Sequence, residues 1–233
     1  MTVSGSYRRL ALVLLSCTAA LSLTACSGDG ATAPPTTTMS GQAIPSDQSS
    51  LYGEKRESFT TVERLYNANP DDPLVAARFA KVLRESGDIK KAKLVLDKIT
   101  RKSDAPSLAF TEQAALYLET GNFAGSESAA RKAIKADNNN YRAWHILGIA
   151  LDAEQKHPEA QTAFEKALSM WKGDAVPVMN NLALNLAAQG QTDKALEMLY
   201  AAKKKDPSRV EIERNIRIIR TLNEPAAYTP KTH

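Results

Sequence analysis

Residues 141–174 read YRAWHILGIALDAEQKHPEAQTAFEKALSMWKGD and contain two apolar patterns separated by a short polar turn. The first pattern places apolar or small residues at helical spacing, at Trp144, Leu147, Gly148 and Leu151. The second resumes that spacing after the turn, at Ala160, Phe164 and Ala167. Because residues three and four positions apart share one face of an α-helix, each pattern predicts an amphipathic helix. Together they predict a helical hairpin.

The hairpin pattern recurs along the chain with a period of 34 residues. Gly87-Asp88-Ile89 precedes Gly121-Asn122-Phe123 by 34 positions. A second set of equivalent residues falls at intervals of 34, 34 and 35: Ile99, Ala133, Ala167 and Ala202. The longer interval indicates one inserted residue near 173–174. A fixed period of this length is the signature of a repeat architecture, so we predict four repeats, at residues 73–106, 107–140, 141–174 and 176–209.

Each predicted hairpin carries a small residue in the middle of both helices. In the first helices these are Ala80, Ala114, Gly148 and Ala183, and in the second helices Ala92, Ser126, Ala160 and Ala195. Small side chains let two helices approach closely while large apolar neighbours fill the gap. A single hairpin cannot bury its apolar face, so the repeats are expected to stack into a continuous core.

These repeats resemble the tetratricopeptide repeat (TPR) family. The matching residues are, repeat by repeat, Phe79, Ala80, Leu83, Gly87, Ala92, Leu96 and Ile99; Phe110, Ala114, Tyr117, Gly121, Ala130 and Ala133; Trp144, Leu147, Gly148, Leu151, Ala160, Phe164 and Ala167; and Leu182, Ala183, Leu186, Gly190, Ala195, Leu199, Ala202 and Pro207. The chain departs from the motif at Ala76, Gln113, Gln155 and His157. In particular, Gln155 replaces the glycine of the turn.

The resemblance implies an all-α fold, a TPR α-solenoid of about four helix-turn-helix repeats. Apolar residues at Phe59, Val62 and Leu65 indicate a partial N-terminal repeat, and residues 210–222 a C-terminal capping helix. The predicted superhelical domain therefore covers residues 55–223.

The family also implies where a partner binds, because TPR ligands usually lie along the concave face formed by the first helices. On this chain the implied groove residues are Lys81, Arg84, Thr111, Leu118, Arg142, His145, Asp152, Asn180, Asn181 and Leu184. Asparagine amides can pair with the backbone of an extended peptide, and Arg142 can meet a carboxylate. A structural role between repeats is the alternative for Asn181.

Groups suited to catalysis or metal binding are scarce in the sequence. Its only histidines are His145, His157 and His233, and neither of the first two has Cys, Asp or Glu at metal-ligand spacing on the same helix face. The sequence also lacks a phosphate-binding glycine loop. We therefore expect a non-enzymatic protein with no metal, no cofactor and no small-molecule substrate.

Residues 1–25 are predicted to be a lipoprotein signal peptide. Two arginines precede an uncharged apolar stretch at 10–23. That stretch is shorter than the roughly 20 residues that a lasting transmembrane helix needs. It ends in Leu23-Thr24-Ala25-Cys26, which resembles the bacterial lipobox and implies acylation of Cys26. Cys17 leaves too short an apolar run for the same motif, and an ordinary signal cut near Ala25 is the alternative.

Acylation would anchor the mature chain to a membrane outside the cytoplasm. Ser27 follows Cys26, which by resemblance to enteric lipoproteins implies a periplasm-facing position at the outer membrane, with inner-membrane retention as the alternative. Residues 26–54 are rich in Thr, Ser, Pro and Gly and predict a disordered tether with an average reach of ~30 Å. Residues 224–233 predict a disordered tail.

The charge balance argues against nucleic acid as a partner. The chain has 30 Lys+Arg against 26 Asp+Glu, and loss of Arg8 and Arg9 with the signal peptide leaves 28 against 26. A net charge of +2 is no nucleic-acid footprint. Basic residues gather at Lys90, Lys91 and Lys93, and again from Lys203 to Arg220. The C-terminal group is either a contact for an acidic partner or lipid headgroups, or a solvated cap.

The whole plan is similar to the TadD family of lipoproteins, which serve in the assembly of tight-adherence (Flp) pili. The shared features are the lipobox, a short tether, about four repeats and a closing segment. This resemblance implies an envelope scaffold whose partner is a secretin or a pilus component. The alternative is a TPR adaptor lipoprotein for peptidoglycan enzymes or a periplasmic protease.

Overall fold

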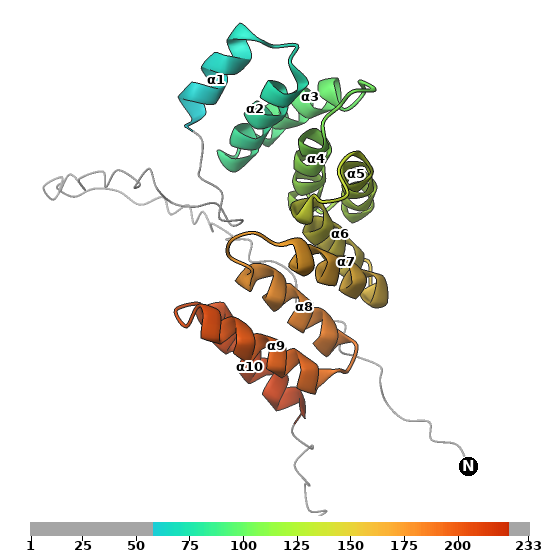
Figure 1. Cartoon of the computed structure of the whole chain (residues 1–233), viewed down its shortest axis with the longest axis vertical. Coiled ribbons are helices and arrows are strands. Elements are labelled where there is room, and N and C mark those ends of the chain that lie inside the picture. Colours follow the sequence, from blue (N-terminus) through green and yellow to red (C-terminus); the bar gives the residue numbers. More distant parts are fainter. Residues whose placement is uncertain (1–57, 224–233) are drawn as a thin grey trace, which may run out of the picture. The chain divides into compact units, whose positions relative to one another are not determined.

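The computed structural model describes residues 58–223, and this segment folds into ten α-helices with no β-strand (Figure 1). The predicted signal peptide, the lipidation site Cys26, the tether and the C-terminal tail lie outside the described residues. Within the described segment the predicted all-α solenoid is confirmed.

The helices form four consecutive pairs with one extra helix at each end. Their bounds are α1 Phe59–Ala68, α2 Pro73–Glu85, α3 Ile89–Ile99, α4 Ser107–Glu119, α5 Phe123–Ala136, α6 Tyr141–Ala153, α7 His157–Met170, α8 Val176–Ala188, α9 Thr192–Lys205 and α10 Val210–Asn223. Each pair from α2–α3 to α8–α9 falls within one predicted repeat. Helix α1 is the second half of the partial repeat, and α10 closes the C-terminal end.

Local sequence signals explain where several helices begin. The Asp72 carboxylate accepts hydrogen bonds from the backbone N–H groups of Leu74 and Val75, at 2.8 and 3.1 Å, and Pro73 occupies the first helical position. Asn122 and Asn140 cap α5 and α6 in the same way. These side chains satisfy amide groups that a helix start leaves without an intrahelical partner, and proline is preorganised for that position.

The turns inside the repeats share a left-handed backbone residue. Gly87, Gly121 and Gly190 have φ angles of 87°, 74° and 77°. In the third repeat Gln155 takes the same conformation, with a φ of 63°. The backbone turn is therefore kept where the glycine is replaced, although a side chain makes this conformation unfavourable.

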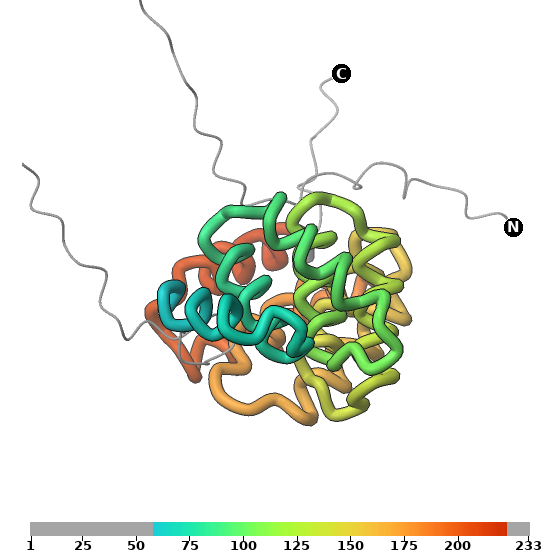
Figure 2. Tube along the Cα trace, turned by 90° about the horizontal axis from the view of Figure 1, so that it is seen from above, coloured from blue at the N-terminus to red at the C-terminus, as the bar shows by residue number. Residues whose placement is uncertain are grey.

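Contacts between repeats are unequal on the two sides of the solenoid. The backbones of successive first helices lie close together, α2 with α4, α4 with α6 and α6 with α8, whereas those of successive second helices in the described segment do not. Second helices meet through long side chains, as where Arg131 of α5 lies 3.6 Å from Glu159 of α7. The first helices therefore line the more tightly curved, concave side, as expected. Figure 2 shows the chain of helices turning about the axis of view from α1 to α10.

The buried core of the stack consists of two apolar clusters, and the partly buried Tyr117 packs against both. One cluster of buried apolar residues runs from Val62 to Leu116 and the other from Ala114 to Ile219. Every small residue predicted at a helix crossing is buried there. At Gly148 an added Cβ would lie 2.5 Å from Cδ1 of the buried Phe164 ring, so α6 and α7 are packed closely at this position. No helix between residues 58 and 223 has the length and apolar character needed to cross a bilayer.

Replacing Gln155 with glycine is expected to stabilise the protein. The left-handed conformation costs a side-chain-bearing residue roughly 1–2 kcal/mol, and the greater freedom of glycine in the unfolded chain offsets about 0.5–1 kcal/mol of the gain. Urea denaturation should therefore show a free energy of unfolding higher by about 0.5–1 kcal/mol.

The matched control is the reverse change, Gly121→Gln. Nothing lies within 4 Å of a Cβ added at Gly121, so only backbone strain changes there. This variant should lose about as much stability as Gln155→Gly gains. A Gln155→Gly protein no more stable than the wild type would contradict the strain assigned to this turn.

Candidate partner-binding site

All ten predicted groove residues lie on the first helices α2, α4, α6 and α8, but the structure divides them into two groups. The partly exposed group is Lys81, Arg84, Leu118, Asp152, Asn180, Asn181 and Leu184, although only 10% of the Arg84 side chain is exposed. The buried group is Thr111, Arg142 and His145. We expected these three residues to present polar atoms to a ligand. In the structure each is buried and makes contacts inside the stack instead.

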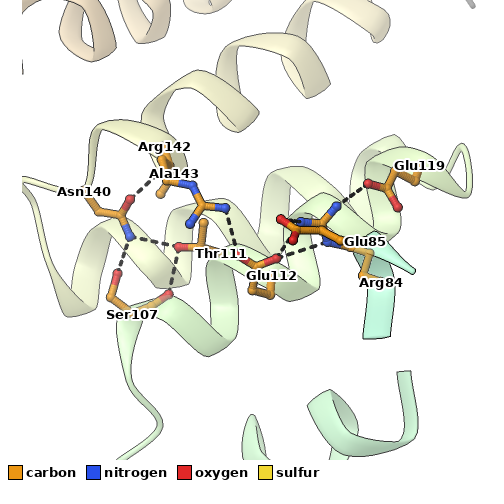
Figure 3. Close-up of polar contacts among 9 residues, drawn as sticks. All are labelled: Arg84, Glu85, Ser107, Thr111, Glu112, Glu119, Asn140, Arg142 and Ala143. Carbon is orange, nitrogen blue, oxygen red and sulfur yellow. Dashed lines mark hydrogen bonds and ion pairs between the residues drawn. The ribbon is translucent and has the colours of Figure 1, made fainter. Parts of the chain in front are cut away.

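A buried carboxylate joins three repeats on this side of the solenoid (Figure 3). Glu112 of α4 is fully buried and accepts hydrogen bonds from Arg84 of α2, at 2.8 Å from Nη2 and 3.0 Å from Nε. Its other oxygen accepts from Nη2 of Arg142 of α6, also at 2.8 Å. Arg84 also pairs with Glu119 at the end of α4. We call Arg84, Glu112, Glu119 and Arg142 the Glu112 cluster.

The two guanidinium groups keep Glu112 ionised. Burial by itself would raise the pKa of this carboxyl group, but the positive charges of Arg142 and Arg84 outweigh burial and hold the pKa below its ordinary value. Burial likewise opposes the charged form of Arg84, while Glu112 and Glu119 raise its pKa. A charge can be buried when it is paired and hydrogen-bonded, and this cluster meets both conditions.

Thr111 belongs to a second inter-repeat contact, around the cap of α6. The Asn140 amide donates to Oγ1 of Thr111 at 2.9 Å and to Oγ of Ser107 at 2.8 Å, while its oxygen accepts from the N–H of Ala143. The Thr111 hydroxyl donates in turn to the Ser107 carbonyl at 2.8 Å. One asparagine thus caps α6 and ties it to α4.

His145 lies between repeats as a neutral ring. Nδ2 of Asn181, on α8, lies 2.9 Å from Nε2 of His145, and an amide nitrogen can only donate, so this ring nitrogen accepts. Burial lowers the pKa of His145 to about 3. The ring packs edge-on to Trp171 at a centroid distance of 5.3 Å. Asn181 therefore has the structural role considered as the alternative from the sequence.

Further polar contacts continue toward the C-terminus. Asn185 of α8 donates to Oδ1 of Asp152 at 2.6 Å, and Nδ1 of His157 lies 2.7 Å from the same oxygen. Asn180 accepts from Asn215 of the capping helix at 2.7 Å. Side-chain hydrogen bonds therefore join each first helix from α2 to α8 to the next one, and α8 to α10.

The sequence reasoning missed the residue at the centre of this arrangement. Glu112 stands three positions after Ala109 and four before Leu116, and both of these are buried. A charged residue at core spacing was the available signal. The partners Arg84 and Arg142 lie 28 and 30 positions away, so their meeting at Glu112 follows only from the stacking of repeats.

A hollow of about 800 Å³ opens beside this network. We call it the Trp171 pocket. Its lining combines the N-terminal part of α4, the α5–α6 turn and the end of α7, and comprises Ser107, Leu108, Thr111, Asp137, Asn139, Asn140, Tyr141, Arg142, Ser169, Met170, Trp171 and Lys172. Aromatic, amide and charged groups meet there, a mixture suited to a peptide segment. Across residues 58–223 no group of three or more His, Cys, Asp and Glu side chains is arranged to hold a metal ion.

Neutralising the central carboxylate is expected to destabilise the stack strongly. Glu112→Gln leaves two guanidinium groups with an uncharged partner, and loss of one member of a buried ion pair typically costs about 3–5 kcal/mol. The control is Glu119→Gln, the same change on the same helix at a carboxylate with a half-exposed side chain, where about 1 kcal/mol or less is expected. Chemical denaturation of both variants measures the difference. Similar losses in the two would contradict the central role of Glu112.

The buried imidazole should make stability depend on pH. Between pH 6.5 and about 3 the unfolded chain binds a proton at His145 that the folded chain does not, so the free energy of unfolding falls as the pH falls. From pH 7 to 5 this contributes a loss of about 2 kcal/mol. The free energy of unfolding is measured at both pH values for the wild type and for His145→Gln. Its fall from pH 7 to pH 5 should be smaller in the variant by about 2 kcal/mol. Equal pH dependence would contradict a neutral, buried His145.

Comparisons with known proteins agree with this architecture. A family model described as tetratricopeptide repeat matches residues 111–175 and 146–210. The thermophilic TPR protein TTC0263 of Thermus thermophilus has a TM-score of 0.58 at 16% identity, over 70% of this chain and 89% of that one. YrrB, described as a TPR protein with an unusual peptide-binding site, has a TM-score of 0.58 at 19% identity, over 73% of this chain and 86% of its own.

MamA gives a TM-score of 0.55 at 18% identity, over 66% of this chain and 89% of that one. A search of curated proteins found no match to the chain. At these identities the structural likeness concerns the fold, and the family model adds the repeat motif itself over residues 111–210. Residues 111–210 therefore carry the tetratricopeptide-repeat motif, and the described residues have the fold of proteins built from that repeat.

Proposed function

We propose that this chain is a non-enzymatic scaffold that binds a segment of a partner protein along the concave side formed by α2, α4, α6 and α8. The observation that carries the proposal is the fixed arrangement of this side, where hydrogen bonds cross every boundary between repeats. A surface whose side chains are already held in place loses little conformational entropy on binding, which favours affinity.

The half-exposed groove residues supply mixed contacts for such a segment. Leu118 and Leu184 each pack partly against the core and keep part of their apolar surface in water. Lys81 on α2 and Asp152 on α6 add charges of opposite sign to the row. The Trp171 pocket lies beside these residues, and Trp171 and Tyr141 are part of its lining. The peptide-binding site in the description of YrrB supports this use of the fold.

The proposed setting is the bacterial envelope. The support comes from the sequence of residues 1–54, where a signal-like segment, Cys26 and a polar tether follow one another. Acylation at Cys26 would hold the scaffold at the outer membrane, facing the periplasm, and a tether raises the effective concentration of a nearby partner. Within this setting we propose a role in assembling a tight-adherence (Flp) pilus, with a secretin or another assembly component as the partner.

The proposal is tested by complementing a strain that lacks the gene. The deletion is expected to abolish Flp pili and leave growth normal, and the wild-type gene should restore pili. Cys26→Ser should move the protein from the membrane to the soluble fraction without unfolding it.

The groove pair Leu118→Ala with Leu184→Ala should weaken partner binding roughly tenfold or more, because truncating anchor residues in an interface costs at least about 1 kcal/mol each.

The matched control removes apolar side chains from the second helices. Leu94 on α3 and Tyr200 on α9 are exposed, and the pair Leu94→Ala with Tyr200→Ala should assemble pili normally. Loss of pili in this pair but not in the groove pair would contradict binding on the first-helix side. Thermal unfolding of each variant verifies that the fold is kept.

The partner is identified by a photo-crosslinking residue placed at position 184, with position 200 as the control. Capture of a secretin or pilus component from position 184 supports the pilus role. Capture of a peptidoglycan enzyme or a periplasmic protease instead assigns the chain to the adaptor lipoproteins. Intact pili in the deletion strain would remove the pilus role and leave the scaffold itself to be judged by the crosslink.

A further inference from the structure

Helix α10 ends the stack and has neighbours on one side only. It packs against α9 and α8 and against no other helix of the described segment (Figure 1). Its inward face buries Ile212, Asn215, Ile216 and Ile219. The opposite face, which in an inner repeat would carry the next hairpin, remains exposed.

The exposed face of α10 is strongly basic. Seven of the 30 cations of the chain and three of its 26 carboxylates lie within residues 203–223, which leaves 23 of each elsewhere. The entire formal charge of +4 is therefore located at this end. Removal of the predicted signal peptide takes two further cations from the remainder, so the mature chain would be basic here and slightly acidic elsewhere.

The arginines on this face form no close ion pair within the described residues, although Arg217 and Arg220 help to lower the pKa of Glu213 through longer-range attraction. The carboxylates of this end are used by other cations, since Glu213 pairs with Lys203, and Asp206 pairs with Arg209. Arg214, Arg217 and Arg220 are exposed, and no carboxylate of residues 58–223 lies within ion-pair distance of them. Their positive charges are available to an external anion.

Apolar side chains are exposed among these arginines. Val210, Ile218 and Leu222 are 79%, 41% and 50% exposed. At 100° per residue, Val210 and Ile218 flank Arg214 on the outward face. A solvated cap would need only charged groups on this side. Cations alternating with aliphatic side chains are instead typical of a helix that lies in a membrane interface, where the cations meet headgroups and the aliphatic groups enter the acyl boundary.

We propose that the exposed face of α10 docks onto a bilayer surface that contains anionic lipids. The proposal rests on the envelope location proposed above. Stable attachment to a membrane requires either several acyl chains or one acyl chain together with a polybasic patch. Docking through α10 would add an orienting contact at the end of the solenoid opposite α1. The concave side would then be held at a fixed angle to the membrane.

The test measures binding of the chain from Ser27 onward, without signal peptide or acyl group, to lipid vesicles. This form keeps every described helix and both hydrophobic clusters. Vesicles of phosphatidylcholine alone are compared with vesicles that also contain phosphatidylglycerol, at low salt, by co-sedimentation. Binding is expected only with phosphatidylglycerol and should weaken as salt is added.

The decisive variant is Arg214→Gln with Arg217→Gln and Arg220→Gln. Each cation near an anionic membrane contributes about fivefold to binding, so the triple change should lower the partition coefficient roughly a hundredfold. The control, Lys90→Gln with Lys135→Gln and Lys166→Gln, removes the same charge from exposed positions on three second helices and should bind within about twofold of wild type. Ile218→Ser with Leu222→Ser should weaken binding several-fold, since both apolar groups leave the interface.

Three results would overturn the proposal. They are no binding to phosphatidylglycerol vesicles, unchanged binding of the arginine variant, and equal losses in the arginine and lysine variants. If the chain does not bind phosphatidylglycerol vesicles, the exposed face of α10 contacts either an acidic protein partner or solvent alone. Vesicle binding needs neither acylation at Cys26 nor an occupied groove, so each of these outcomes leaves the proposed scaffold function standing.

Discussion

Contact between successive first helices is the constraint on which the rest of this structure depends. A hairpin of two amphipathic helices leaves one apolar face uncovered, so each repeat is stable only against its neighbour. Here the neighbours meet most closely through α2, α4, α6 and α8, while the backbones of successive second helices lie farther apart. The same contacts bend the stack, define its concave side and bring together side chains that are about 30 residues apart in sequence.

Polar groups within these contacts fix the relative position of the helices, in addition to holding them together. An apolar interface between helices tolerates small shifts, whereas the carboxylate of Glu112 is satisfied only where Arg84 and Arg142 both reach it. Replacing buried ion pairs by apolar residues often preserves stability in other proteins, so registry is the better explanation for the cost of burying these charges. Our hypothesis is that the cluster selects one stacking geometry.

The repeat architecture could be predicted from the sequence because it depends on local spacing. Small residues at helix crossings and glycines at turns recur in register, and the helices begin where that register places them. The polar network could not be predicted in the same way. Arg142 and His145 have the helical position of groove residues, yet their side chains reach Glu112 and Asn181 of adjacent helices. Partners on adjacent helices decide burial there, and the sequence of a single repeat does not contain those partners.

Burial of these charged and polar groups also explains why the surface properties of the protein are divided between two places. The concave side neutralises its strongest charges internally, so contact there depends on shape, amide groups and partly exposed leucines. No helix of the described segment packs on the outer face of α10 and brings carboxylates to its arginines, so their charge remains outward. This face therefore exposes charges of the kind that are paired between the inner repeats. The two surfaces differ in chemistry, so one can select a protein segment while the other responds to an anionic surface and to salt.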